Sequence, residues 1–588
     1  MRIIQPEMPE RQLQDFSELP KPYGVIKIVK SESPSDTFGH LEREFRKIDS
    51  KRRFRLGKVY DTEKIPAGHD NSVVEGYHHD VDELDVSKPH TMDLVNFIDI
   101  EVSRPVAELM RGGMDVEMHS GTHEETLDSL SRRGYTRYRK VTTPLGPGIL
   151  VAVNDKSGES AIALPNMYGD DNVQHYQAIA KFLEVPSDKL KTITHDSTYE
   201  DTLDGEFEGK KFAPDTFVMG GWIMGKYLEG RARLAKRHGE LTSHWEGFRK
   251  AGDERPINRI IAERLAGPDT SKMDGKNVRK HESQYKKARE TLAAMLETEE
   301  ADRAFSMPTD HVHRKGEVCD TIYDVTEALN KISKNVPVVK EIPKASSGFA
   351  FDKDDGIFID DVIVEPLKVA RLRFEDSRGT EHVMGVSDNP YGDLSGKVSS
   401  VLLKREDVKD LMFIGSSGSI RGLEKDDEVA IGDISIPMDV YSAKGDPLNH
   451  TVENSLLYHM EDEIKSDLVD RTEQRPVPPV NHSHLIASSH LKVATPLFEN
   501  TDTVDMWRDT YADTVDVEIG EVVDSLEKAP PKKRPRFGVM TYVEDIIGFS
   551  GYTLGETDRK LLERSRTRVV DIMVDYLDIK KILPSKGS

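Results

Sequence analysis

Residues 411–440 read LMFIGSSGSIRGLEKDDEVAIGDISIPMDV, and this stretch guides the interpretation of the rest of the chain. Leu411–Ile414 is apolar throughout, which predicts a short buried strand ending in the turn-forming run Gly415–Ser419. Glycines let a backbone approach a ligand closely, and free N–H groups beside serine hydroxyls suit a phosphate, a sugar hydroxyl or a water molecule. Glu428–Ile436 predicts a further strand with a turn.

Carboxylates stand beside two further apolar segments downstream. Glu544 and Asp545 follow a strand predicted over 537–543, where a carboxyl group can serve as a general acid; a simple turn is the alternative. Asp516-Val517-Glu518 opens a helix predicted over 515–526, where a carboxylate can accept hydrogen bonds from a vicinal diol. The alternative for this second site is an acidic first turn that complements the helix dipole.

Strands and helices alternate along residues 350–588. Beyond the segments above, we expect strands at 369–374 and 484–488 and helices at 397–403 and 558–576. This alternation predicts an α/β sheet with helices on both faces. In such folds ligands bind beyond the carboxyl ends of the strands, which is where the polar groups lie in this sequence.

Three stretches of this region together resemble the nucleoside phosphorylase/nucleosidase superfamily. They are residues 411–440, TVDVEIGEVVDSLEK at 514–528 and RFGVMTYVEDIIG at 536–548, in the order that is typical of purine and uridine phosphorylase-like domains. The resemblance covers residues 350–588 and implies a three-layer αβα domain with a central mixed sheet. An unrelated region ahead of such a domain is similar to the arrangement in AMP nucleosidases. The resemblance implies cleavage of an N-glycosidic bond through a transition state like an oxocarbenium ion.

The resemblance also implies a role for each polar site. Asp545 would be the catalytic acid that protonates the leaving purine at N7, and Glu518 would hold the ribose 2′ and 3′ hydroxyls. Val517 stands where a methionine usually packs under the ribose. The nucleophile side would be lined by the glycine-serine loop, which consists of Gly415, Ser416, Ser417 and Gly418.

Three positions depart from the superfamily pattern. Glu544 replaces a serine beside the catalytic aspartate, and two adjacent carboxyl groups raise the pKa of one of them. Phe413 stands where bacterial hexameric phosphorylases carry a phosphate-binding arginine, which favours water over phosphate as the nucleophile. Arg421 is similar to an arginine of AMP nucleosidases and could bind a phosphate bidentately; a surface arginine is the alternative.

The sequence therefore predicts an N-glycosidase that hydrolyses a purine nucleoside or nucleotide. Phosphorolysis is the nearest alternative, and a non-catalytic nucleotide-sensing protein is another, because of the departures at Val517 and Glu544. The expected partners are a small-molecule nucleoside or nucleotide with water or phosphate. Neither a cofactor nor a metal is expected. Members of this superfamily usually assemble, so a homo-oligomer is expected.

Composition restricts the setting of this activity. The chain has 588 residues and a formal net charge of −23, which disfavours nucleic acid and anionic membrane surfaces as partners. Its single cysteine, Cys319, excludes a disulfide framework within the chain. The start, MRIIQPEMPE, lacks a signal pattern, and no apolar run approaches the roughly 18 residues of a membrane span, so we expect a cytoplasmic protein without membrane contact.

The N-terminal half shows no resemblance to a known family. We expect an irregular N-terminal segment over 1–90, a mostly helical α+β domain of unknown role over 91–340, and a linker at about 335–350. Within the middle region the sequence predicts a strand–turn–strand over 141–153 and helices at 122–134, 170–183 and 217–233. The glycines of the last helix suit tight packing, because a phosphate loop would need them between a strand and a helix.

Overall fold

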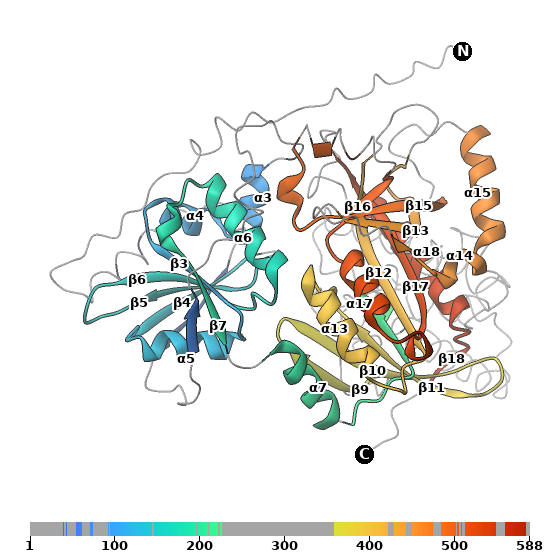
Figure 1. The fold of residues 1–588 in the computed structure, drawn as a ribbon, viewed down its shortest axis with the longest axis horizontal. Coiled ribbons are helices and arrows are strands. Elements are labelled where there is room, and N and C mark those ends of the chain that lie inside the picture. Colours follow the sequence, from blue (N-terminus) through green and yellow to red (C-terminus); the bar gives the residue numbers. More distant parts are fainter. Residues whose placement is uncertain are drawn as a thin grey trace, which may run out of the picture.

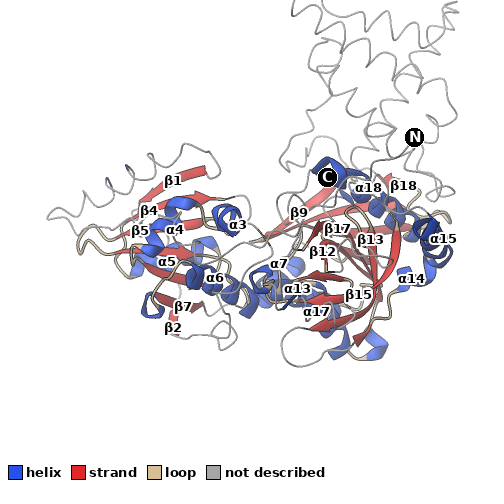
Figure 2. Ribbon diagram, turned by 90° about the horizontal axis from the view of Figure 1, so that it is seen from above, coloured by secondary structure: helices blue, strands red, loops and turns tan. Residues whose placement is uncertain are grey.

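The computed structural model describes residues 94–143, 146–195, 198–209, 211–221, 358–420, 429–442, 450–473, 484–500, 512–547 and 559–583, with two short strands and a few single positions outside these ranges. The described chain is a mixed α/β structure with two β-sheets, which lie side by side in Figures 1 and 2. None of the helices among these residues is both long and apolar enough to cross a membrane.

The first sheet has seven strands in the order β1-β4-β5-β6-β3-β7-β2. β3 pairs in parallel with β6 and β7, and β5 pairs antiparallel with β4 and β6. The β4–β5 hairpin confirms the strand–turn–strand predicted over 141–153. The strands are β1 Arg55–Asp61, β2 Asn71–Val74, β3 Asp115–His119, β4 Arg137–Thr142, β5 Ile149–Val153, β6 Ser160–Leu164 and β7 Leu190–His195.

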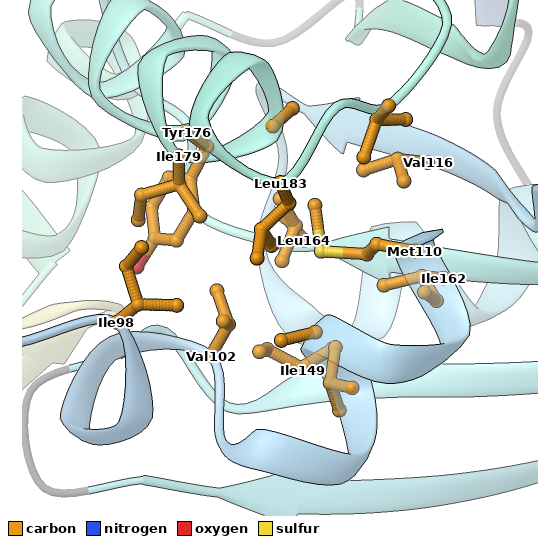
Figure 3. Close-up of a cluster of buried hydrophobic side chains, with 14 of the residues drawn as sticks. Ile98, Val102, Met110, Val116, Ile149, Ile162, Leu164, Tyr176, Ile179 and Leu183 are labelled. Carbon is orange, nitrogen blue, oxygen red and sulfur yellow. The ribbon is translucent and has the colours of Figure 1, made fainter. Parts of the chain in front are cut away.

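Helices pack on both faces of this first sheet. α3 (Leu94–Glu101), α4 (Arg104–Arg111) and α6 (Asp170–Phe182) bury one face in a single apolar cluster, part of which is drawn in Figure 3. α5 (His123–Arg132) packs on the other face. Its start is the predicted capping box, in which the Thr122 hydroxyl accepts from the Glu125 N–H and the Glu125 carboxylate accepts from the Thr122 N–H.

The second sheet has eleven strands and occupies the remainder of the described chain. Its main path is β14-β13-β15-β16-β12-β8-β11-β10-β18, with β9 paired to β10 and β17 paired to both β12 and β13. Its strands are β8 Thr216–Met219, β9 Phe358–Val364, β10 Leu367–Glu375, β11 Glu381–Ser387, β12 Asp410–Ser419, β13 Ile434–Ser442, β14 His450–Thr451, β15 Leu485–Lys492, β16 Thr514–Asp516, β17 Arg536–Ile546 and β18 Lys581–Leu583.

Part of this sheet closes on itself. β12 pairs with β16, β16 with β15, β15 with β13, β13 with β17, and β17 again with β12. These five strands therefore form a ring in which β17 has a partner on each side. The closure fixes the carboxyl ends of β12 and β17 relative to each other, because neither strand can slide without breaking pairs with two neighbours.

Two apolar clusters hold helices against the second sheet. One contains side chains of α7, α13 and α17, and the other contains side chains of α14 and α18. Among them, α13, α17 and α18 confirm the strand and helix alternation predicted for 350–588, whereas α7 precedes that region. Their bounds are α7 Tyr199–Gly209, α13 Asp393–Leu403, α14 Ser455–His459, α15 Glu461–Glu473, α17 Ile519–Lys528 and α18 Arg559–Tyr576.

Three local predictions differ from the structure. The helix predicted from residue 217 is wrong at its start, because residues 217–219 belong to β8, which pairs in parallel with β11 and β12. The second sheet therefore takes a strand from ahead of the linker predicted at 335–350, and that linker lies outside the described residues. The turn predicted at Gly415–Ser419 is also wrong, because β12 continues to Ser419 alongside β17. Residues 514–516 form β16, so the helix predicted from 515 begins later, at Ile519.

The two sheets are joined by buried contacts between α6 and the second sheet. The ammonium group of Lys492, a residue 1% exposed on β15, donates to Asp171 on α6 at 2.6 Å and to Glu521 on α17 at 2.7 Å. Burial alone would lower the pKa of Lys492, but the two carboxylates raise it above its usual range. The Asp171 N–H also donates to the Asp393 carboxylate at 2.8 Å, so four charged side chains hold this junction.

We expect the substitution Lys492→Met to destabilise the protein strongly. It would leave the carboxylates of Asp171 and Glu521 without their shared cation, and removing one partner of a buried ion pair costs about 3–5 kcal/mol. Urea denaturation followed by circular dichroism measures the free energy of unfolding. The matched control is Lys528→Met, because Lys528 is exposed at the end of α17, where it bonds Asp524, and its loss should change stability by less than about 1 kcal/mol. Equal stability of the two variants would contradict the prediction.

Candidate functional site

A cavity of about 410 Å³ lies between two parts of the chain. The first part contains the seven-stranded sheet with α3 to α6, and the second part contains the eleven-stranded sheet with its helices. On one side it is lined by the carboxyl ends of β12 and β17 and by the residues that follow β11, β15 and β16. On the other side it is lined by α3, α6 and the residues that follow β6. Its volume falls in the range of small-molecule sites, and its position beyond strand ends is the one expected for a ligand site in α/β structures.

The pairing of β12 with β17 brings the two predicted catalytic segments together. The strands run parallel in register from Asp410 opposite Arg536 to Ser417 opposite Val543. The next pair is Gly418 with Asp545, so Glu544 is an extra residue on β17, as in a β-bulge. Successive strand residues normally point to opposite faces, and the bulge explains why Glu544 and Asp545 both line the cavity.

Asp545 is a buried carboxyl group at the base of the cavity. It is 7% exposed, and a Cβ atom on Gly418 would lie only 3.1 Å from its Oδ1, so the glycine leaves room for the carboxyl group. Burial, followed by the charge of Glu544, raises the pKa of Asp545 to about 8. Asp545 is therefore largely protonated at neutral pH and able to donate a proton.

The serines of β12 bind neighbouring groups on β17. The Ser416 hydroxyl donates to Glu544 Oε1 at 2.8 Å, and the hydroxyls of Ser417 and Thr541 lie 2.8 Å apart. Glu544 therefore belongs to β17 but accepts a hydrogen bond from a side chain of β12. This contact positions a second carboxylate beside Asp545.

Glu518 lies in the cavity where β16 leads into α17. The amide of Asn389 donates to Glu518 Oε1 at 3.2 Å, and burial, followed by the charge of Asp516, raises the pKa of Glu518 well above its usual value. Asp516 instead caps the helix, because its carboxylate accepts from the N–H groups of Glu518 and Ile519. Asp516 therefore contacts the start of the helix, whereas ribose binding by Glu518 stays a prediction.

The opposite wall of the cavity comes from the first part of the chain. Glu101 Oε2 accepts from the Tyr176 hydroxyl at 3.1 Å and lies 3.6 Å from His175 Nε2. His175 Nδ1 lies 2.8 Å from the hydroxyl of Thr495, which belongs to the second part. The His175 ring also meets the edge of Tyr391, with centroids 5.7 Å apart. These contacts tie α3 and α6 to the far side of the cavity.

Most of the predicted site residues meet in this cavity. Its lining includes, from the predicted set, Ser416, Ser417, Gly418, Val517, Glu518 and Asp545. Gly415 lies within β12 just before the lining residues, where a Cβ atom would come 2.7 Å from the Phe413 ring. Arg421 lies outside the described residues.

Sequence reasoning missed several residues of the cavity. Asn389 and Tyr391 follow β11, and Glu499 follows the strand β15 after a short turn. The rule that polar residues at the ends of apolar strands mark a site would have found Asn389. No local signal marks Glu101 or His175, because they lie on helices of the other part of the chain.

Carboxyl groups are the main ionisable groups of the cavity. Its described lining contains no lysine or arginine, and the acidic groups are Glu101, Glu499, Asp516, Glu518, Glu544 and Asp545. Burial, followed by the charge of Asp545, also raises the pKa of Glu499 well above its usual value. Near the cavity, Asp171, Asp393 and Glu521 bring carboxylate oxygens within 4.8 Å of one another. The Lys492 ammonium already binds two of these three groups, which argues against a metal ion there.

Comparisons with known proteins gave matches only among solved structures. No family model matches the sequence, and no curated protein matches it. One similar structure is a futalosine hydrolase mutant of Helicobacter pylori, with 15% identity and a TM-score of 0.26 over 38% of this chain and 89% of that chain. Another is a 5′-methylthioadenosine/S-adenosylhomocysteine nucleosidase from Colwellia psychrerythraea with adenine, with 14% identity and a TM-score of 0.26 over 39% and 88% of the two chains. A third is the nucleosidase of the same name from Neisseria meningitidis with methylthio-immucillin-A, with 10% identity and a TM-score of 0.27 over 38% and 92%.

Proposed function

We propose that this protein hydrolyses the N-glycosidic bond of a purine nucleoside or nucleotide, with Asp545 as the general acid. The observation that carries the proposal is the position of Asp545, a buried carboxyl group with a raised pKa in the same cavity as Glu518 and the serines of β12. The order of three sequence motifs similar to the nucleoside phosphorylase/nucleosidase superfamily supports the same reaction.

The reaction requires three actions at the substrate. Asp545 donates its proton to N7 of the purine as the bond between C1′ and N9 breaks, which lets the base leave as a neutral molecule. Glu518 accepts hydrogen bonds from the ribose hydroxyls in place of the Asn389 amide. Water adds its oxygen to C1′ and loses a proton, and Asp545 is protonated again from solvent. The products are the free base and ribose from a nucleoside, or ribose 5-phosphate from a nucleotide.

Water is favoured over phosphate as the nucleophile because the described lining offers no cationic side chain of lysine or arginine to bind a phosphate. A phosphate dianion would enter a cavity whose described lining offers six carboxyl groups and neither lysine nor arginine. Proteins bind phosphate with arginine, lysine or clusters of backbone N–H groups. The Glu544 carboxylate beside Ser416 would further repel an anion on this side.

Asp545→Asn should reduce release of the base by about 10²–10⁴-fold, which is the usual contribution of a general acid. Chromatography of free base formed from adenosine, inosine, guanosine and AMP measures this loss. Asp462→Asn, on the exposed side of α15, is the matched control and should behave like the wild type. Tight binding of a purine nucleoside by the wild type without any base release would favour the non-catalytic alternative instead.

Base release should not depend on phosphate, and its sugar product should be free ribose from a nucleoside and ribose 5-phosphate from AMP. Reaction in phosphate-free buffer, with the sugar product identified by mass spectrometry, tests this expectation. Formation of ribose 1-phosphate in proportion to added phosphate would identify the enzyme as a phosphorylase.

The raised pKa of Asp545 predicts a limit to activity at high pH. The acid must be protonated to act, so kcat/KM should be constant below about pH 8 and fall as the pH rises above the pKa of about 8. In Glu544→Gln the negative charge beside Asp545 is lost, so the pKa of Asp545 should fall and the alkaline limb should move to lower pH. A limb that stays in place in this variant would show that Glu544 does not tune the acid.

A further inference from the structure

The cavity is completed by residues from both parts of the chain, and the side formed by the first part has no role in the proposed chemistry. We call Glu101, Asn172 and His175 the acidic wall; Glu101 lies at the end of α3, and the other two lie on α6. The acid, the ribose-binding carboxylate and the serines all come from the second part. The acidic wall must therefore face whatever portion of the substrate extends away from these groups.

Contacts between lining residues give the order of groups along the cavity. A Cβ atom on Gly418 would lie 3.1 Å from Asp545 Oδ1, and Ser416 on the same strand bonds Glu544, so both carboxyl groups lie at the ends of β12 and β17. Asn389 bonds Glu518, and the hydroxyl of Tyr391, two residues further on, lies 3.5 Å from Nδ1 of His175. The other ring nitrogen of His175 lies 3.6 Å from Glu101, so this chain of contacts leads from Glu518 to Glu101. With the base at Asp545 and the ribose at Glu518, Glu101 meets the group attached to the ribose on the side away from the base.

The contacts of Glu101 hold its carboxylate in one orientation. The hydroxyl of Tyr176 and the imidazole of His175 both approach Oε2, and the described residues provide no hydrogen-bond donor to Oε1. His175 is itself held by Thr495 and packed against the rings of Phe97 and Tyr176. A carboxylate fixed in this way, in a described lining without lysine or arginine, attracts a positive or donor group and repels an anion.

We propose that the acidic wall recognises the sugar end of the nucleoside and selects a cationic or hydrogen-bond-donating group there, such as an amine, over a phosphate. This inference rests on the proposed function and narrows it from nucleoside or nucleotide to a nucleoside without a 5′-phosphate. Glu101 is the specificity-determining residue, and Tyr176 and His175 are positioning residues.

The test compares three adenosine compounds that differ only at the 5′ position. They are 5′-amino-5′-deoxyadenosine, which carries a cation, adenosine, which is neutral, and AMP, which carries an anion. Values of kcat/KM are measured for the full-length wild type and for Glu101→Gln. Glu124→Gln, an exposed change of the same kind on α5, is the matched control. Binding of the three compounds to Asp545→Asn by calorimetry reports charge preference without turnover.

We expect the wild type to prefer the amine over AMP, and Glu101→Gln to reduce that preference by about tenfold or more, because a partly buried charge pair interacts well above thermal energy. Asn172→Asp adds a carboxylate to the same wall and should increase the preference. This second variant keeps the inference testable if Glu101→Gln proves unstable in a thermal melt. Glu124→Gln should leave the preference as in the wild type.

The outcomes separate this inference from the proposed function. If base release needs Asp545 but the wild type uses the amine and AMP equally, only the inference is overturned. The same conclusion follows if the ratio of kcat/KM for the amine to that for AMP is unchanged in both Glu101→Gln and Asn172→Asp. Charge-selective binding without base release would overturn the proposed hydrolysis and retain the role of the wall. Failure of all three compounds to bind or react would overturn both.

Discussion

The parallel pairing of β12 with β17 is the constraint on which the site depends. It joins Asp410–Ser419 to Arg536–Ile546 over their full length, and β17 is held on its other edge by β13. A slip by one residue would turn every side chain of one strand to the opposite face, so this register is fixed by burial on both faces as well as by hydrogen bonds. The bulge at Glu544 is the one irregularity, and it directs two adjacent carboxyl groups into the same cavity.

The concentration of acidic groups in the cavity has an energetic cost that the structure meets in two ways. Burial raises the pKa of Asp545, Glu499 and Glu518, which favours the protonated, uncharged form of each group. Outside the cavity, the carboxylates of Asp171 and Glu521 are neutralised by the buried Lys492. The same lysine joins the two parts of the chain, so the contact that compensates these charges also holds the acidic wall over the site.

Local patterns in the sequence predicted much of the second part of the chain. Apolar runs indicated β10, β12, β15 and β17, and the helix predicted over 558–576 is α18. The capping box at Thr122 and the hairpin over 141–153 were likewise confirmed, because capping and turn formation depend on a few neighbouring residues. Errors arose where a partner strand decided the outcome: residues 217–219 form a strand and Gly415–Ser419 remain extended because β12 has neighbours on both sides.

The sequence by itself determined which groups could act: a glycine-serine segment, a carboxylate beside a helix and a carboxyl group at the end of an apolar strand, all in one α/β region. Only the tertiary structure decided that these groups share one cavity, that Glu544 faces the same side as Asp545, and that Glu101 and His175 complete the site from the other part of the chain. The physical reason is the separation along the chain of the residues that decide each property. Chemical type and local periodicity are properties of neighbouring residues, whereas strand register, burial and the pKa shifts that follow from burial arise only when distant segments pack together.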